Sequence, residues 1–185
     1  MFDGRVKKSR FLRVELDAEN IGKPFMFNRF YDFSIHRGRS NLPAFSQHFQ
    51  VFNQLYKQGV MLEGMILKPN MVLPGLTCPV QNSLAEVADA TMKCLLRTVP
   101  AAVPGIAFLS GGQSAELASA RLNAMNVRFK SKLPWELSFS FARAIQQPAM
   151  EIWQGKEANV SKAQQALYHR AKCNFEARRG EYKNQ

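Results

Sequence analysis

The chain has 185 residues, which is enough for one domain with its own core. Hydrophobic residues make up 46% and charged residues 21%, a balance that excludes a disordered polar tail. The net charge of +11 would suit a polyanion or a small phosphorylated ligand, but the basic residues are scattered in short groups. On charge alone, solvated surfaces are favoured over a specific anion site.

Three cysteines, Cys78, Cys94 and Cys173, are widely spaced and form no Cys-x-x-Cys pair. This pattern indicates neither a disulfide framework nor a zinc site, and it is typical of the reducing cytoplasm. The N-terminus lacks an apolar signal segment, and prolines and glycines interrupt the longest uncharged run, residues 98–115. We therefore predict a cytoplasmic protein without a membrane-spanning helix.

Residues 1–45 differ from the rest of the chain. Half of the 14 phenylalanines lie there among scattered charges, with no sustained period of 2 or 3.6. We predict no regular structure for this segment. From Leu42 the pattern becomes helical up to Gly59, with apolar residues on one face: Phe45, Phe49, Phe52, Leu55 and Tyr56.

Residues 60–68 form an apolar run that predicts a buried strand, ended by Pro69. Ser83 and Glu86 have the spacing of a capping box, which predicts a helix that ends before Pro100. Residues 106–109 predict a second strand, closed by a glycine turn at residues 110–114 and followed by a helix through residues 116–122.

Residues 135–141 predict a third strand, which leads to a helix from about Arg143 to Trp153 and a last helix over about residues 159–178. Buried strands that alternate with helices predict an α/β fold with a parallel sheet and right-handed crossovers. The pattern is compatible with either a doubly wound sheet or part of a (β/α) barrel.

Lys68 ends the first predicted strand, where parallel α/β folds bind their ligands. Burial between apolar neighbours would lower the lysine pKa and supply the neutral amine that attacks a ketone. A lysine that extends into solvent from the strand end is the alternative. Glu63 lies five residues earlier, so strand alternation places it on the opposite face, in an ion pair away from Lys68.

Two further features lie at the same ends of the predicted strands. The Ser110-Gly111-Gly112 turn can direct backbone N–H groups at an anion, and Arg143 can bind a phosphate as a charged fork. Each also has a structural reading, as a tight turn and as a surface arginine. Together with Lys68 they predict a site for a phosphorylated carbonyl compound. No aromatic residues alternate with the basic ones as on a nucleic-acid platform, so we predict no nucleic-acid partner.

Several long motifs resemble those of class I fructose-bisphosphate aldolases, in a form similar to bacterial members. The resemblance runs from about residue 50 to Tyr182 and is carried by residues 62–72, 97–100, 103–114, 122–126 and 138–144. It implies the C-terminal portion of a TIM (β/α)8 barrel, about strands 6–8 with their helices, without the N-terminal half of the barrel. We expect residues 46–185 to be this portion and residues 1–45 to be foreign to the family, through truncation or a frameshift.

The resemblance also implies roles for individual residues. Lys68 would form the imine with the substrate ketone, Ser110 and Gly111 would lie in the phosphate-binding loop, and Arg143 would bind phosphate. The backbones of Leu109 and Ala142 would line the same site. The implied reaction is the reversible, glycolytic cleavage of fructose 1,6-bisphosphate to dihydroxyacetone phosphate and glyceraldehyde 3-phosphate. It requires no metal or organic cofactor, and the family is homo-oligomeric.

The family's acid/base carboxylates and its other active-site lysines come from earlier strands and have no counterpart in this sequence. With half the barrel missing, Lys68 would be hydrated, and we expect cleavage far slower than in a full-length relative. Two alternatives remain at this point. One is a non-catalytic fragment or basic interaction module. The other is a transaldolase-like Schiff-base lyase, but the glycine turn and Arg143 would form a site for two phosphates, which disfavours this alternative.

Overall fold

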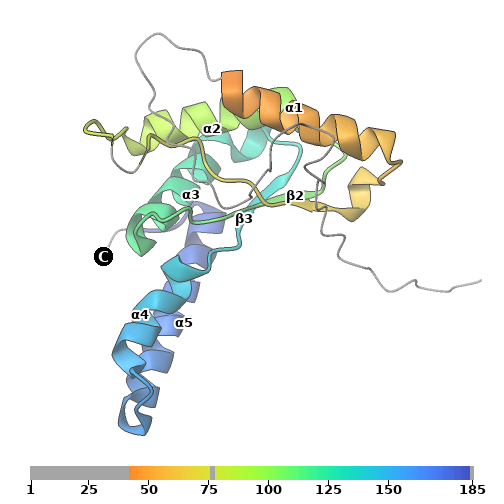
Figure 1. Cartoon of the computed structure of the whole chain (residues 1–185). Helices are drawn as coiled ribbons and strands as arrows, with labels where there is room; N and C mark the ends of the chain where they lie inside the picture. The colour runs from red at the N-terminus through yellow and green to blue at the C-terminus, as the bar shows by residue number, and fades with distance from the viewer. Residues whose placement is uncertain (1–41, 76–77, 184–185) are drawn as a thin grey trace, which may run out of the picture. The chain divides into compact units, whose positions relative to one another are not determined.

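A computed structural model describes residues 42–75 and 78–183 (Figure 1). The prediction for residues 1–45 therefore lies outside the described residues, except for the backbone of the last four. The elements in chain order are α1 (Leu42–Lys57), η2 (Leu62–Gly64), β1 (Ile66–Leu67), α2 (Leu84–Thr98), β2 (Gly105–Phe108), α3 (Ala115–Phe129), η3 (Lys130–Lys132), β3 (Glu136–Phe139), α4 (Arg143–Trp153), η4 (Glu157–Asn159) and α5 (Val160–Arg179).

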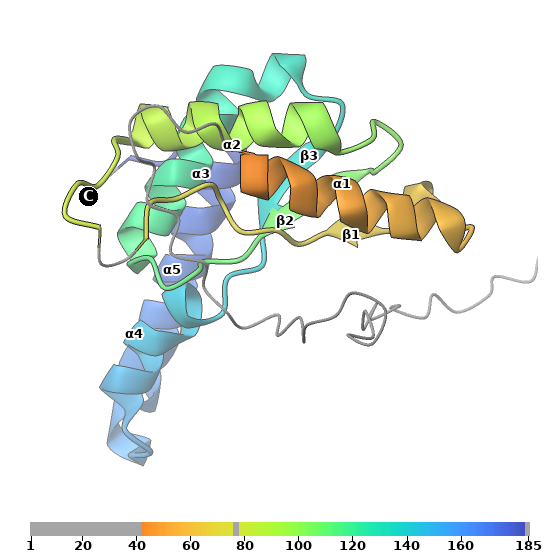
Figure 2. The same cartoon turned by 45° about the horizontal axis from the view of Figure 1, so that its top comes forward.

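The three strands form a parallel sheet in the order β1-β2-β3, which confirms the predicted α/β class. Ile66 pairs with Gly105, and Gly105 pairs with Glu136, so one register runs across the sheet. Neighbouring parallel strands require crossover connections, which α2 and α3 provide. Figures 1 and 2 show these two helices beside the sheet.

The first predicted strand is much shorter than expected. Only Ile66 and Leu67 pair with β2, and residues 62–64 form a 3-10 helix instead. The reason is that β2 begins at Gly105, opposite Ile66, so residues 60–65 have no partner strand among the described residues. Glu63 lies in the 3-10 helix, where strand alternation does not apply. It is exposed and forms no ion pair with a described residue, so its predicted position was wrong.

The two faces of the sheet differ in burial. Ile106, Phe108 and Leu137 alternate onto one face and are almost fully buried, so they form the core with the helices. On the other face Ala107 is half-buried and Glu136 is exposed. Ile66 shares that face and is 58% exposed. Described residues therefore cover only one face of this sheet, whereas parallel sheets are ordinarily covered on both.

The helix α2 begins at the predicted capping box. The Ser83 hydroxyl accepts a hydrogen bond from the Glu86 N–H, and the Glu86 carboxylate accepts one from the Ser83 N–H at 2.9 Å. The helix buries Val87, Ala88, Thr91 and Leu95, as predicted, whereas Leu84 is partly exposed. A buried hydrogen bond of 2.9 Å from the Val72 N–H to the Thr91 hydroxyl ties the loop after β1 to this helix.

Helix α1 packs against α2, and only part of its predicted apolar face is buried. Phe52 and Leu55 are buried, but Phe49 and Tyr56 are exposed. The apolar residues of α1 thus cover more of the helix circumference than α2 contacts. A helix face that is apolar by sequence is buried only where a neighbouring element covers it.

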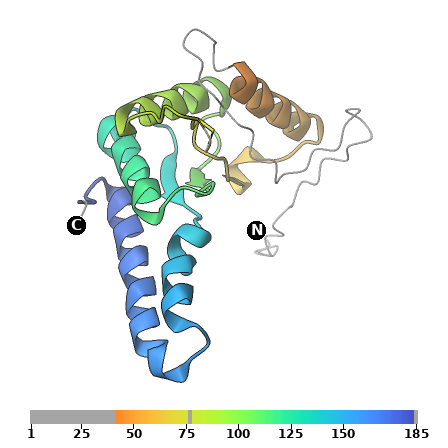
Figure 3. The ribbon, with the colours of Figure 1, turned by 60° about the vertical axis from the view of Figure 1, so that its left-hand side comes forward.

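Helix α5 packs against both α3 and α4, and Figure 3 shows α4 and α5 side by side as an antiparallel pair. Its contact with α3 is polar at its centre. The Ser119 hydroxyl donates to the Asn174 side chain at 2.8 Å, and the Arg170 guanidinium donates to the Ser119 hydroxyl at 2.7 Å. Further along, the Asn126 amide donates to the Ala177 carbonyl at 3.2 Å. These buried contacts fix the register of α5 on α3.

Candidate functional site

The chain continues to pair beyond the carboxyl ends of the strands. The Leu109 N–H donates to the Pro69 carbonyl at 3.0 Å, and the Ser140 N–H donates to the Phe108 carbonyl at 2.8 Å. These two hydrogen bonds hold the three segments that follow the strands side by side. Each predicted site residue lies in one of those segments or next to it. The sheet therefore brings the predicted residues together at the carboxyl ends of its strands, where parallel α/β folds bind their ligands.

Lys68 directly follows β1, at the edge of the sheet. Its side chain is exposed rather than buried, so the predicted desolvation of the amine is not found among the described residues. Its neighbour Pro69 is buried, but Ile66 on β1 is exposed, as Lys68 is. The alternative reading, a lysine that extends into solvent from the strand end, describes the observed side chain.

The turn after β2 is held by its glycines. Gly111 and Gly112 have φ angles of 62° and 85°, a region that favours glycine. A Cβ atom at Gly111 would lie 2.7 Å from Oδ1 of Asn70, so the Asn70 side chain and the turn are in direct contact. The N–H groups of Gly111 and Gly112 have no acceptor in the described part of the chain. They are available to an anion, which is the arrangement of a backbone nest.

Leu109 and Ser110 precede these glycines. Ser110 is buried and Leu109 is half-buried. The N–H of Leu109 already donates to Pro69, so it cannot donate to a ligand as well. Its contribution is to hold the turn against the end of β1.

Gln113 stabilises the turn through hydrogen bonds to Ser110. Its backbone N–H and its side-chain amide both donate to the Ser110 carbonyl, at 3.1 Å and 2.8 Å. Its side-chain oxygen accepts a hydrogen bond of 2.8 Å from Nη1 of Arg121 on α3. Gln113 and Arg121 are both buried, and sequence reasoning assigned no role to either.

The segment after β3 leads into the N-terminus of α4. Ala142 is the N-cap residue of this helix and supplies no side-chain acceptor to its first turn. The N–H groups of Arg143 and Ala144 have no acceptor among the described residues, so they remain available at the positive end of the helix dipole. The Arg143 side chain is exposed and forms no ion pair within the described ranges.

Other reactive side chains lie elsewhere. Sγ of Cys94 is 3.9 Å from Nδ1 of His48, between α1 and α2, and burial raises the pKa of the Cys94 thiol to about 11. His169 on α5 lies beside Cys173 at 3.6 Å. The cysteines are free, no cluster of potential metal ligands occurs in residues 42–75 and 78–183, and no helix there has the length and apolar character to cross a membrane.

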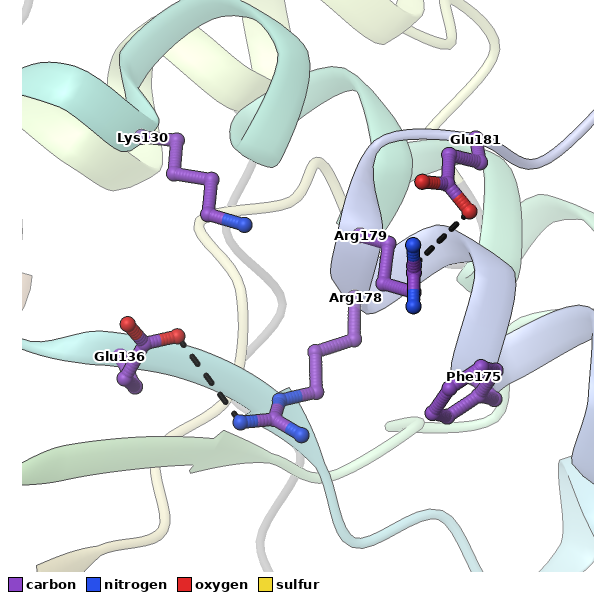
Figure 4. A pocket seen from close by; sticks show the side chains of 6 residues that line it. All are labelled: Lys130, Glu136, Phe175, Arg178, Arg179 and Glu181. Carbon is purple, nitrogen blue, oxygen red and sulfur yellow. Dashed lines mark ion pairs between the residues drawn. The ribbon is translucent and has the colours of Figure 1, made fainter.

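A basic hollow of about 270 Å³ lies near the amino end of β3 (Figure 4). Neither Lys68 nor Arg143 is among the residues that line it. Two of its three basic side chains are paired. Arg179 is 2.8 Å from Glu181 and Arg178 is 3.9 Å from Glu136. The hollow is therefore largely neutralised by its own carboxylates, and it is separate from the candidate site.

The chain resembles known proteins over most of its described length. A family model described as class-I fructose-bisphosphate aldolase matches residues 46–185. The chain is 54% identical over 134 residues to a probable fructose-bisphosphate aldolase class 1 of Xylella fastidiosa, a match that covers 72% of this chain and 40% of that protein. It is 54% identical over 132 residues to a cytoplasmic fructose-bisphosphate aldolase isozyme of Cicer arietinum, covering 71% of this chain and 36% of that protein.

A solved structure gives the same match in three dimensions. Fructose-bisphosphate aldolase from Plasmodium falciparum, in a complex with TRAP and a small-molecule inhibitor, superposes with a TM-score of 0.74 at 44% identity. The match covers 78% of this chain and 41% of that one. The chain thus spans about 40% of the length of the curated relatives that it matches.

Proposed function

The chain belongs to the class I fructose-bisphosphate aldolase family, and from this premise we propose that it carries the imine-forming and phosphate-binding half of a fructose 1,6-bisphosphate lyase site. The three parallel strands would be about strands 6–8 of a (β/α)8 barrel, with residues 46–185 as the family portion. The observation that carries the proposal is the meeting of Lys68, the Gly111 turn and the N-terminus of α4 at one sheet edge.

The proposed chemistry begins at Nζ of Lys68. The neutral amine attacks the ketose carbonyl carbon, and loss of water leaves an iminium ion on the lysine. The iminium accepts the electron pair of the C3–C4 bond as that bond breaks, and the C4 hydroxyl loses a proton to become the aldehyde of glyceraldehyde 3-phosphate. Protonation at C3 and hydrolysis then release dihydroxyacetone phosphate. The sequence of steps balances without a metal or an organic cofactor.

The phosphate groups would be held by the backbone and by one arginine. Four backbone N–H groups, those of Gly111, Gly112, Arg143 and Ala144, have no acceptor among the described residues. They can donate hydrogen bonds to an anion. The exposed guanidinium of Arg143 adds a charged fork. Ser110 and Leu109 would shape this site through the backbone, and Ala142 would leave the helix end open. The substrate partner is therefore a phosphorylated sugar, in the cytoplasm as for the relatives named cytoplasmic.

We expect the 185-residue chain alone to cleave fructose 1,6-bisphosphate far more slowly than a full-length relative. The amine of Lys68 is exposed, whereas attack on a ketone is favoured in a site that excludes water and holds the substrate in place. Imine formation is less demanding than cleavage, since it requires only the amine and a ketone. The adduct on Lys68 is thus the sharper test of the proposed site.

The test is borohydride reduction of the chain with dihydroxyacetone phosphate. Reduction converts the imine to a secondary amine, which adds the mass of the ketone less one oxygen, and peptide mapping locates the adduct. We expect modification at Lys68 and its loss in Lys68→Met. Lys93 on α2 is also exposed, so Lys93→Met is the matched control and should keep the adduct. Absence of any adduct, or an equal yield at Lys93, would favour a non-catalytic chain instead.

A further inference from the structure

We propose that Arg121 is a positioning residue for the phosphate-binding turn, which it controls through the side chain of Gln113. This inference rests on the proposed function, because it assigns a role to the same turn. Arg121 lies on α3 and contacts neither Lys68 nor Arg143 in any described hydrogen bond or ion pair. It acts through another residue, so it is not itself a catalytic group.

Two hydrogen bonds connect Arg121 to the turn through the Gln113 side chain. Nη1 of Arg121 donates to Oε1 of Gln113 at 2.8 Å, and this fixes which end of the amide faces the arginine. The Nε2 end of Gln113 must then face the turn, where it donates to the Ser110 carbonyl at 2.8 Å. The Ser110 carbonyl thus accepts hydrogen bonds from both the backbone and the side chain of Gln113, while the N–H groups of the two following glycines have no acceptor among the described residues.

The environment of Arg121 sets it apart from an ordinary helix arginine. Its side chain is only 3% exposed, yet no described carboxylate pairs with it and its Nε atom has no hydrogen-bond partner. Desolvation lowers the pKa of Arg121 from its usual value. A buried, unpaired charge costs stability, so packing alone gives no reason for an arginine at this position.

A buried cation behind the turn does have a use toward an anion. Its charge is screened less by solvent than a surface charge, and the Gln113 side chain links it to the turn that holds Gly111 and Gly112. Arg121 would therefore assist phosphate binding in two ways, by fixing the Gln113 amide and by adding positive potential. The expected ligand class is the phosphate monoester of a sugar.

Arg170 offers an instructive comparison. It is also buried with an unpaired Nε, but its guanidinium bonds the Ala115 carbonyl and the Ser119 hydroxyl and approaches the Glu116 carboxylate at 3.5 Å. Those partners join α5 to α3. Arg170 therefore has a structural role, whereas the single described partner of Arg121 is the residue that fastens the turn.

The experiment measures phosphate affinity and turn protection in the same samples. Inorganic phosphate is titrated into the wild-type chain, Arg121→Met and Arg121→Lys. In the same samples, hydrogen exchange is followed at the backbone N–H of Gln113, which donates to the Ser110 carbonyl. We expect Arg121→Met to bind phosphate about two- to tenfold more weakly, the range that corresponds to the loss of one hydrogen bond. Arg121→Lys should fall between, since it keeps the charge but loses the fork. The Gln113 amide should exchange faster in both variants, with no change at amides of α5.

Arg128→Met is the matched control, because Arg128 is on the same helix but is exposed and paired with Asp89 at 2.8 Å. It should bind phosphate as the wild type does. Unchanged affinity and exchange in both Arg121 variants would overturn the inference, as would an equal loss of affinity in Arg128→Met. If the wild-type chain binds no phosphate, the proposed function fails, while exchange at Gln113 still decides whether Arg121 positions the turn. If Arg121→Met does not fold, Arg121→Lys carries the same two measurements.

Discussion

Gly111 and Asn70 contact each other across the ends of β1 and β2, so a side chain at position 111 would displace Asn70. Gly111→Ala places a Cβ 2.7 Å from Oδ1 of Asn70, in a backbone conformation with φ of 62°. We expect the free energy of unfolding to fall by about 1–2 kcal/mol from the left-handed conformation alone. Displacement of Asn70 should disturb the turn as well, so phosphate affinity should fall. Chemical denaturation and phosphate titration measure the two effects.

Gly59→Ala is the control for backbone strain. Gly59 has a similar φ of 64°, but a Cβ added there would meet nothing within 4 Å, so it carries the conformational cost without the collision. It should lose similar stability and keep phosphate affinity. If Gly59→Ala and Gly111→Ala behave alike in both measurements, the contact with Asn70 has no effect on the turn.

Sequence patterns predicted some residues of the candidate site and gave no signal for others. Lys68, Gly111 and Arg143 were predicted to lie together because a strand end is marked by an apolar run that stops, and parallel strands end at the same side of the sheet. Gln113 and Arg121 were not assigned, since a contact between a turn and the second turn of a helix has no sequence period. Burial of Arg121 could not be predicted either, because an arginine on a helix is ordinarily exposed.

The capping box of α2 stabilises the protein in a pH-dependent way. Ser83→Ala removes the acceptor for the Glu86 N–H and should lower the free energy of unfolding by about 1 kcal/mol. The pKa of Glu86 lies below its usual value of 4.5, mainly because the Ser83 backbone N–H donates to the carboxylate. The Ser83 side chain has a smaller effect in the same direction. That contribution is present above pH 4.5 and is lost as the pH falls through the lowered pKa. Glu86→Gln should therefore approach wild-type stability in acid.

Ser114→Ala serves as the control for this element. Ser114 caps α3 by accepting from the Leu117 N–H at 3.2 Å, but the third helical residue there is leucine and cannot complete a capping box. Ser114→Ala should lower the free energy of unfolding by a similar amount, and this loss should not depend on pH in the acid range. Denaturation at neutral pH and in acid, below the lowered pKa of Glu86, distinguishes the two caps. A stability difference between wild type and Glu86→Gln that stays constant across this range would contradict the assigned role of the carboxylate.

Helices were predicted more accurately than strands, and the reason lies in what fixes their ends. The last helix, predicted over about residues 159–178, is observed over Val160–Arg179, and Ser83 begins α2 as expected. A helix end depends on local capping, which the sequence carries. The extent of β1 depends on where β2 begins, so the apolar run at residues 60–68 could not reveal that only two residues pair.

The whole described unit presents one covered and one open sheet face. Ile66 is 58% exposed and Met61 is 71% exposed, close together in sequence at the β1 edge. Among the described residues β1 pairs only with β2, so its other edge has free backbone groups. An open apolar edge of this kind promotes association between copies of a chain. Lys68 at the end of β1 is exposed as well.

We therefore predict that the chain associates with itself through the β1 edge and that Ile66→Lys weakens this association. A charge at an exposed edge position opposes pairing of two edges, and Ile66 is not part of the buried core, so the fold should persist. In sedimentation velocity, the average mass of the wild type should rise with concentration, and that of Ile66→Lys should rise much less. Val80 is also 71% exposed but belongs to the loop before α2 and not to a strand, so Val80→Lys adds the same charge and should behave as the wild type. A wild-type chain that stays monomeric throughout, or an equal effect of the two lysines, would show that the edge does not mediate association.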